Sequence, residues 1–123
     1  MPLMLTAWHW TVINGEEEIK VIVNGKNQIT ELSKTCSIEK AIGESIGIEK
    51  ISHAYLLALH EELEHMILHE KLDNVFYELA FERLIARGQY FYPVDTSAYF
   101  SMELDTPEDF HDAINRIPKH LQA

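Results

Sequence analysis

The side chains best able to do chemistry are concentrated in the segment His60–Glu70, which is rich in histidine and glutamate. At the pitch of an α-helix, Glu61, His65 and His69 lie in one row at four-residue spacing. Two histidines spaced in this way can ligate a divalent metal, and the glutamate could act as a third ligand or as a general base. A metal site formed by Glu61, His65 and His69 is therefore one hypothesis for this segment.

The spacing of the histidines excludes the zinc-protease motif. That motif needs two histidines four residues apart, with a glutamate directly after the first. Here His60-Glu61 is followed by His65, five residues after the first histidine. At 3.6 residues per turn the two imidazoles point about 140° apart, so they cannot hold one zinc ion in that way.

Two leucines accompany the histidine row. Leu57 and Leu68 fall on the same nominally polar side of the predicted helix, opposite its apolar stripe. An exposed mixture of leucine, histidine and glutamate is more typical of a partner surface than of a plain solvated face. Because a metal site also needs further ligands and supporting hydrogen bonds, the partner surface is favoured over the metal site.

Aromatic residues near the carboxyl end form a second group of candidate contacts. Tyrosine is enriched at binding hot spots because it buries a large area and keeps a polar group. No basic patch accompanies these aromatics, so nucleic-acid binding is not predicted. The residues predicted to contact a partner are Leu57, Glu61, Glu64, His65, Leu68, His69, Tyr90, Tyr92 and Tyr99.

Other catalytic signatures are missing from the sequence. Cys36 is the single thiol, and no histidine can be assigned to it as a partner. There is no Gly-x-Ser-x-Gly motif, and the five glycines do not form a phosphate-binding loop. A non-catalytic role without a cofactor is therefore favoured.

The charge balance indicates the kind of partner. The chain has 20 acidic and 10 basic residues, a formal net charge of −10. Such a chain is repelled by nucleic-acid phosphates and anionic lipids and is attracted to basic surfaces. With one cysteine it can form no internal disulfide, which favours a cytoplasmic location. The sequence also predicts no membrane-spanning segment.

The elements that position these residues indicate an α+β fold, with all 123 residues in one compact domain. Asn-Gly pairs at Asn14 and Asn24 mark tight turns between β-rich runs. Those runs predict an N-terminal antiparallel β-meander. Its strands are expected at Leu5–Ile13, Glu18–Val23 and roughly Gln28–Leu32.

Helices are expected in the middle of the chain. Ser37 could cap a short helix that runs through Ile46 and ends at Gly47. Apolar residues at three- and four-residue steps predict a long helix from Ile51 to about Glu70. A further helical pattern runs from Leu72 to Arg87 and ends at Gly88. The residues expected on the core-facing stripe of the long helix are Tyr55, Leu56, Leu59, Leu63, Met66 and Ile67.

A further strand and a C-terminal helix complete the predicted fold. Apolar residues at every second position over 98–104 indicate a half-buried strand, and another short strand is expected near Tyr90. Thr106 followed by Pro107 and two acids is a strong helix start, and Pro118 ends that helix.

The sequence therefore predicts a non-catalytic acidic binding protein that neutralises or regulates a basic macromolecular partner. An immunity protein or antitoxin that inhibits a bacterial toxin, such as a nuclease, has this character. Two alternatives stay open. One is a small metal-binding protein or metal-dependent enzyme that uses Glu61, His65 and His69. The other is an oligomerisation or scaffold domain joined through the face that carries Leu57 and Leu68.

Overall fold

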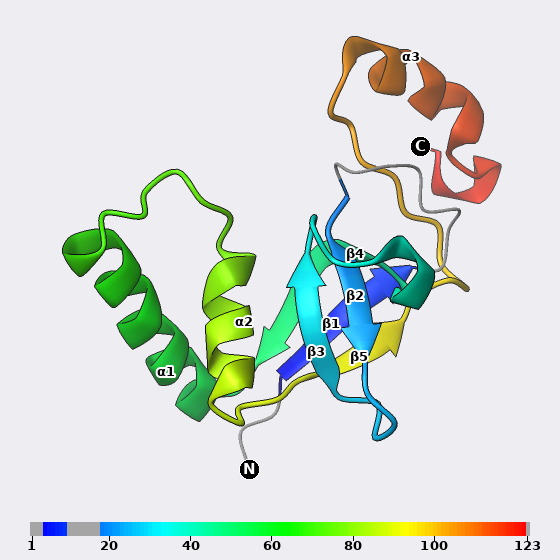
Figure 1. Cartoon of the computed structure of the whole chain (residues 1–123). Helices are drawn as coiled ribbons and strands as arrows, with labels where there is room; N and C mark the ends of the chain where they lie inside the picture. Colours follow the sequence, from blue (N-terminus) through cyan, green and yellow to red (C-terminus); the bar gives the residue numbers. More distant parts are fainter. Residues whose placement is uncertain (1–3, 10–17, 123) are drawn as a thin grey trace.

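The computed structural model describes residues 4–9 and 18–122, with side chains from residue 18 onward (Figure 1). The strands are β1 Met4–His9, β2 Lys20–Val23, β3 Ile29–Ser33, β4 Gly43–Ile51 and β5 Tyr92–Asp95. The helices are α1 His53–Glu64, α2 Glu78–Ala86 and α3 Pro107–Arg116, with shorter helical segments at Ile38–Lys40, His65–His69 and Lys119–Leu121. The predicted α+β class is confirmed: antiparallel strands come first, then helices, a further strand and a C-terminal helix.

The five strands form one sheet in the order β3-β2-β4-β1-β5. Strand β5 runs parallel to β1, and the other neighbouring strands are antiparallel. The three N-terminal strands do not pair strictly in chain order, because β4 lies between β1 and β2. Local turn signals determine hairpins such as β2–β3, whereas the position of β4 depends on contacts that are distant in sequence. The Asn14-Gly15 turn and the end of the first predicted strand lie outside the described residues.

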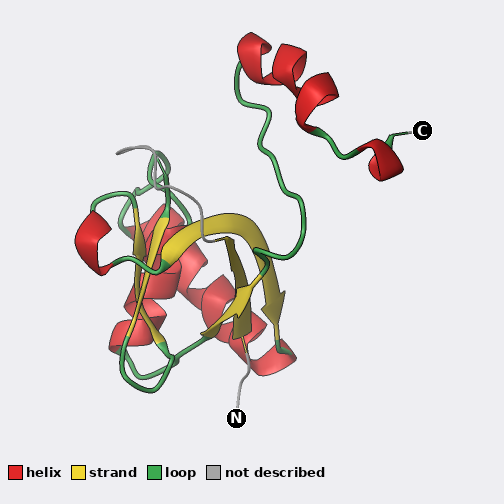
Figure 2. Cartoon of the chain, turned by 90° about the vertical axis from the view of Figure 1, so that its right-hand side faces the viewer, coloured by secondary structure: helices red, strands yellow, loops and turns green. Residues whose placement is uncertain are grey.

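Strand β4 replaces the short helix expected from Ser37 to Ile46, so that prediction was wrong. Only Ile38–Lys40 forms a single 3₁₀ turn. Gly47 has a φ of 74°, a conformation that favours glycine. It lies where the pairing register between β1 and β4 shifts, between Thr6↔Glu49 and Trp8↔Ser45. This bulge accompanies the strong bend of the sheet that Figure 2 shows.

The bend brings the two edges of the sheet together at one end. The backbone N–H of Ile29, the first residue of β3, donates to the carbonyl of Phe91 at 2.9 Å, directly before β5. The concave sheet and the α1–α2 pair enclose the larger apolar core. Its buried residues are Val21, Ile29, Leu32, Tyr55, Leu59, Met66, Ala80, Phe81, Leu84, Ile85 and Phe91.

Helix α1 and the π-helical segment His65–His69 together confirm the long helix predicted from Ile51 to Glu70. The Ser52 side chain caps α1 by accepting from the Tyr55 N–H at 3.2 Å. Of the predicted stripe, Tyr55, Leu59 and Met66 are buried and Leu63 is half-buried, whereas Leu56 and Ile67 are exposed. The stripe is therefore narrower than predicted.

Helix α2 begins at Glu78 rather than at Leu72, so the second predicted helix is six residues too long at its start. Its end is as predicted, since Gly88 follows it with a φ of 83°. Within the described residues, no helix is long and apolar enough to cross a membrane.

The strand expected at 98–104 is wrong, although the short strand expected near Tyr90 exists as β5. Residues 98–104, all of which the structure describes, belong to no sheet: residues 98 and 99 lie in a turn and a bend, and residues 100–104 continue as an irregular segment. Helix α3 begins as predicted, with a capping box between Thr106 and Asp109 and with Pro107 in its first turn. Figures 1 and 2 both show α3 standing away from the sheet and from α1 and α2, at the end of this irregular segment.

Candidate partner-binding surface

The outward side of α1 and the following π-helical segment carries leucines and acids together. Leu57 is 59% exposed and Leu68 is 57% exposed, whereas large apolar side chains are normally buried. The exposed Glu61 and Glu64 lie between them in sequence, and all four share one stripe at helical pitch. We call these four residues the outer face.

The outer face is acidic because its helix contains no lysine or arginine. Residues 51–70 include four glutamates and neither basic residue type. Among the described residues, Glu64 forms an ion pair with a histidine, with 3.8 Å between its Oε2 and His60 Nδ1, and both side chains are exposed. An exposed pair of this kind contributes little stability. The negative potential of Glu61 and Glu64 is therefore available to a partner.

His65 and His69 lie close together, as their spacing predicts. Their ring centroids are 5.4 Å apart with an angle of 32° between the planes. His65 Nε2 also lies 3.5 Å from Glu70 Oε2. The structure does not gather Glu61 with these two histidines in a suitable geometry, since the described residues hold no group of three or more potential ligands for a metal ion.

Glu62, which the sequence analysis did not single out, is the most constrained acid of α1. Its side chain is 2% exposed and accepts from Arg83 Nη1 at 3.1 Å, while Arg87 Nη2 lies 2.5 Å from its other oxygen. Arg83 also donates to both carboxylate oxygens of Glu70. These hydrogen bonds from Arg83 hold the pKa of Glu70 below its ordinary value. The network joins α1 and the π-helical segment to α2.

A signal for Glu62 existed in the sequence. It lies three residues after Leu59 and four before Met66, so it falls within the buried stripe of α1. An acid at such a position needs a basic partner, and Arg83 and Arg87 are spaced by one helical turn on the next helix. An open hollow of about 430 Å³ lies beside this network. Its lining is mainly polar and comes from α1, the π-helical segment, and α2 with the residues that follow it, and it includes both glutamates of the outer face.

The predicted tyrosines lie on β5 and on the segments directly before and after it. Tyr90 is exposed and Tyr92 is half-buried at the start of β5, where Gln28 Nε2 donates to Tyr92 Oη at 3.5 Å. Tyr99 is exposed on the irregular segment before α3. Figure 1 shows β5 as an edge strand of the sheet, and the segment that carries Tyr99 leads from β5 toward α3, away from α1. The predicted contact residues therefore belong to at least two separate surfaces.

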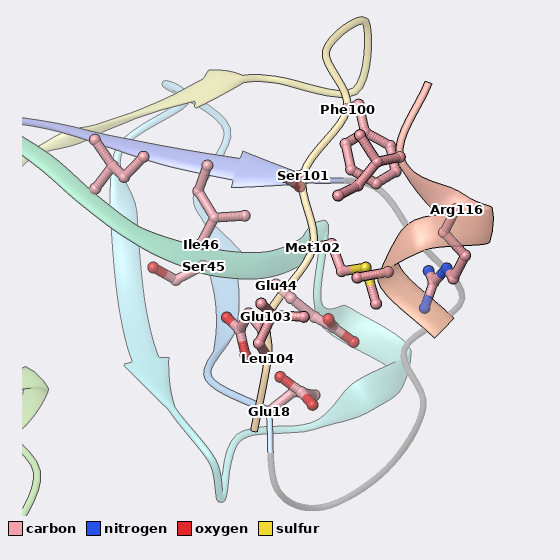
Figure 3. A pocket seen from close by; sticks show the side chains of 13 residues that line it. Glu18, Glu44, Ser45, Ile46, Phe100, Ser101, Met102, Glu103, Leu104 and Arg116 are labelled. Atoms are coloured by element: carbon pink, nitrogen blue, oxygen red, sulfur yellow. The ribbon is translucent and has the colours of Figure 1, made fainter. Parts of the chain in front are cut away.

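A second hollow, of about 550 Å³, lies between β4 and the C-terminal segment (Figure 3). The side chains of Glu18, Glu44 and Glu103 point toward one another there. The pKa of Glu103 is raised, first by burial and then by the negative charges of Glu18 and Asp105. This region repeats the acidic character of the rest of the chain.

Comparison with known proteins adds no relative. No protein-family model matches this sequence, and no curated protein sequence matches it. The geometry of the chain therefore carries the functional argument: the outer face combines exposed leucines with glutamates on a helix that has no lysine or arginine.

Proposed function

We propose that this protein is a non-catalytic acidic binding protein that neutralises or regulates a basic macromolecular partner through its outer face. The supporting observation is that Leu57 and Leu68 are exposed on the same helix stripe as Glu61 and Glu64. Apolar anchors next to charges of one sign are typical of an interface in which burial supplies affinity and charge selects the partner.

The whole-chain charge supports the same assignment. A net charge of −10 accelerates encounter with a basic protein and opposes binding to nucleic acid or to anionic lipid. A basic toxin, such as a nuclease inhibited by an immunity protein or an antitoxin, is the partner class with this chemistry. A cytoplasmic location in a bacterium belongs to the same proposal.

The test compares two variants of equal charge. One is Glu61→Lys with Glu64→Lys, on the outer face. The matched control is Glu31→Lys with Glu39→Lys, at exposed positions on β3 and the 3₁₀ turn. Each glutamate-to-lysine change adds two charges, so both variants carry −6 instead of −10.

Tagged wild type and both variants are used to capture proteins from the host cell, and the captured protein is identified by mass spectrometry and purified. We expect a basic protein that the wild type and the control retain and that the outer-face variant loses. With the purified partner, the association rate constant should fall about tenfold or more at low salt for the outer-face variant, and much less for the control. Equal binding by the two variants, or a captured partner that is acidic, contradicts the proposal.

A further inference from the structure

Helix α3 has an apolar face that the rest of the chain covers only in part. At helical pitch Phe110, Ala113, Ile114 and Ile117 share one face. Ala113 is buried and Ile117 half-buried, but Phe110 is 65% exposed and Ile114 is 71% exposed. The exposed half of the face is thus formed by a phenylalanine and an isoleucine one turn apart.

The ends of α3 are well formed although this face is bare. The Thr106 side chain accepts from the Asp109 N–H at 3.1 Å, and Asp109 accepts from the Thr106 N–H at 3.0 Å. At the other end, Gln122 Nε2 donates to the carbonyls of Ile114 at 3.2 Å and Ile117 at 2.9 Å. Capping fixes where the helix begins and ends, but a helix this short is only marginally stable without packing. The exposed Phe110 and Ile114 therefore mark a missing packing surface.

The distribution of charge along α3 identifies a surface that fits it. Glu108 and Asp109 lie in the first turn and Arg116 in the last, with Lys119 shortly after. Two such helices side by side in opposite directions place each acidic start beside the basic end of the other, and their dipoles also attract in this arrangement. A parallel pair would place like charges together.

We propose that the occupant is a second copy of this chain, and that two α3 helices pair antiparallel with Phe110 of each against Ile114 of the other. The contact is self-complementary, as a two-fold interface requires. It lies beyond the proposed function, because it uses a different surface and a different partner.

The irregular segment before α3 makes this pairing compatible with the high charge of the chain. Each copy carries a net charge of −10, which would oppose close contact between the main parts of the two copies, meaning the sheet with α1 and α2. Both views show α3 held away from the sheet and from α1 and α2 (Figures 1 and 2). Salt screens charges that are more than about 8 Å apart at physiological ionic strength. If two copies meet only through their α3 helices, their main parts therefore repel each other weakly.

The test measures the mass of the full chain in solution by sedimentation equilibrium. We expect wild type at twice the 14.2 kDa of one chain, and Phe110→Ser with Ile114→Ser at the mass of one chain. The matched control is Val75→Ser with Phe76→Ser, an exposed apolar pair in the loop between α1 and α2, which should remain dimeric. Circular dichroism checks that each variant is folded.

Disulfide trapping tests the direction of the pair. In an equimolar mixture of Phe110→Cys and Ile114→Cys chains, the mixed disulfide should form well over half of the cross-linked product, about half being the share that random pairing would give. In an antiparallel pair these two positions face each other, whereas like positions are separated by about 6 Å along the axis. Native Cys36 is buried, and wild type run in parallel shows whether it contributes any cross-link.

Three results would overturn the proposal. The first is a wild type that is monomeric at about 1 mM chain, where even a weak dimer would form. The second is a Phe110/Ile114 variant that stays dimeric while folded. The third is a mixed disulfide that makes up about half of the cross-linked product or less. Salt dependence distinguishes a second copy from a basic partner on α3. The dimer should persist as salt is raised, because the burial of Phe110 and Ile114 contributes affinity that does not depend on charge. Association of α3 with a basic protein in place of itself, weakened by salt, would also overturn it.

Discussion

The ion-pair network around Glu62 makes a quantitative prediction about stability. Glu62→Ala removes a carboxylate that is 2% exposed and bound by Arg83 and Arg87. Breaking a fully buried ion pair costs about 3–5 kcal/mol. Here the arginines are 29% and 58% exposed, so water can solvate them after the change. We therefore expect a lower cost, about 2 kcal/mol, close to that of one hydrogen bond to a charged group.

The assay is thermal and urea unfolding followed by circular dichroism, with Glu61→Ala as the matched control at the neighbouring exposed position. At about 4 °C for each kcal/mol, Glu62→Ala should lower the melting temperature by about 8 °C. Glu61→Ala should change stability by less than about 0.5 kcal/mol while weakening partner binding. Equal stability of the two variants would refute the conclusion that Glu62 fastens α1 to α2.

Three further predictions concern other sites. His65→Ala with His69→Ala should change stability by less than about 0.5 kcal/mol, and zinc should move the wild-type melting temperature by less than about 1 °C, because a third ligand is not gathered with them among the described residues. A zinc-dependent gain that the double variant loses would favour the metal site. The pKa of Glu49 is raised, chiefly by burial. As pH rises above about 4.5, the unfolded chain therefore releases this proton before the folded chain does, and the free energy of unfolding falls. Glu49→Gln should stabilise the protein at neutral pH but not at pH 3, and urea unfolding at the two pH values would test this. Gly88→Ala should cost about 1 kcal/mol in thermal unfolding, because the φ of 83° is unfavourable for alanine although there is room for its methyl group; an unchanged melting temperature would contradict this.

Helices in this chain could be predicted because their signals are local. The spacing of Tyr55, Leu59 and Met66 places one stripe of α1 against the core whatever the sheet order is. Thr106 and Asp109 likewise define the start of α3 through contacts only three residues apart. Both kinds of signal depend on neighbours within one or two helical turns.

Strands were harder to predict because their partners are distant in sequence. The segment Gly43–Ile51 contains residues compatible with helix or strand, and pairing with β1 and β2 decides between them. Residues 98–104 show the opposite error. Their alternating pattern is typical of a half-buried strand, but a turn with a hydrogen bond from the Tyr99 N–H to the Thr96 carbonyl directs the chain away from the sheet. Alternating apolar and polar residues indicate which side of a strand would be buried. They do not show whether another strand lies beside it to form backbone hydrogen bonds.

The candidate surface was predictable in part for the same reason. Leu57 and Glu61 share a helix face by spacing alone, and the structure places them there. That Tyr92 lies on an edge strand beside β1 depends on sheet order, which no local pattern encodes. Glu62 is one of several acids on a charged helix. Only its position in the apolar stripe distinguishes it from its exposed neighbours.

The two proposed contacts involve opposite ends of the molecule and depend differently on charge. The outer face lies on α1 and the dimer contact on α3, and Figure 1 shows these two helices at opposite ends of the molecule. A dimer through α3 would therefore leave both outer faces open, and a partner with two basic sites would bind the second face as an intramolecular event. Salt should weaken the outer-face contact because it screens the attraction to a basic partner, and it should affect the α3 contact less because that contact also buries Phe110 and Ile114. A partner complex that dissociates in salt into dimers of this chain, rather than into single chains, is the combined consequence of these two surfaces.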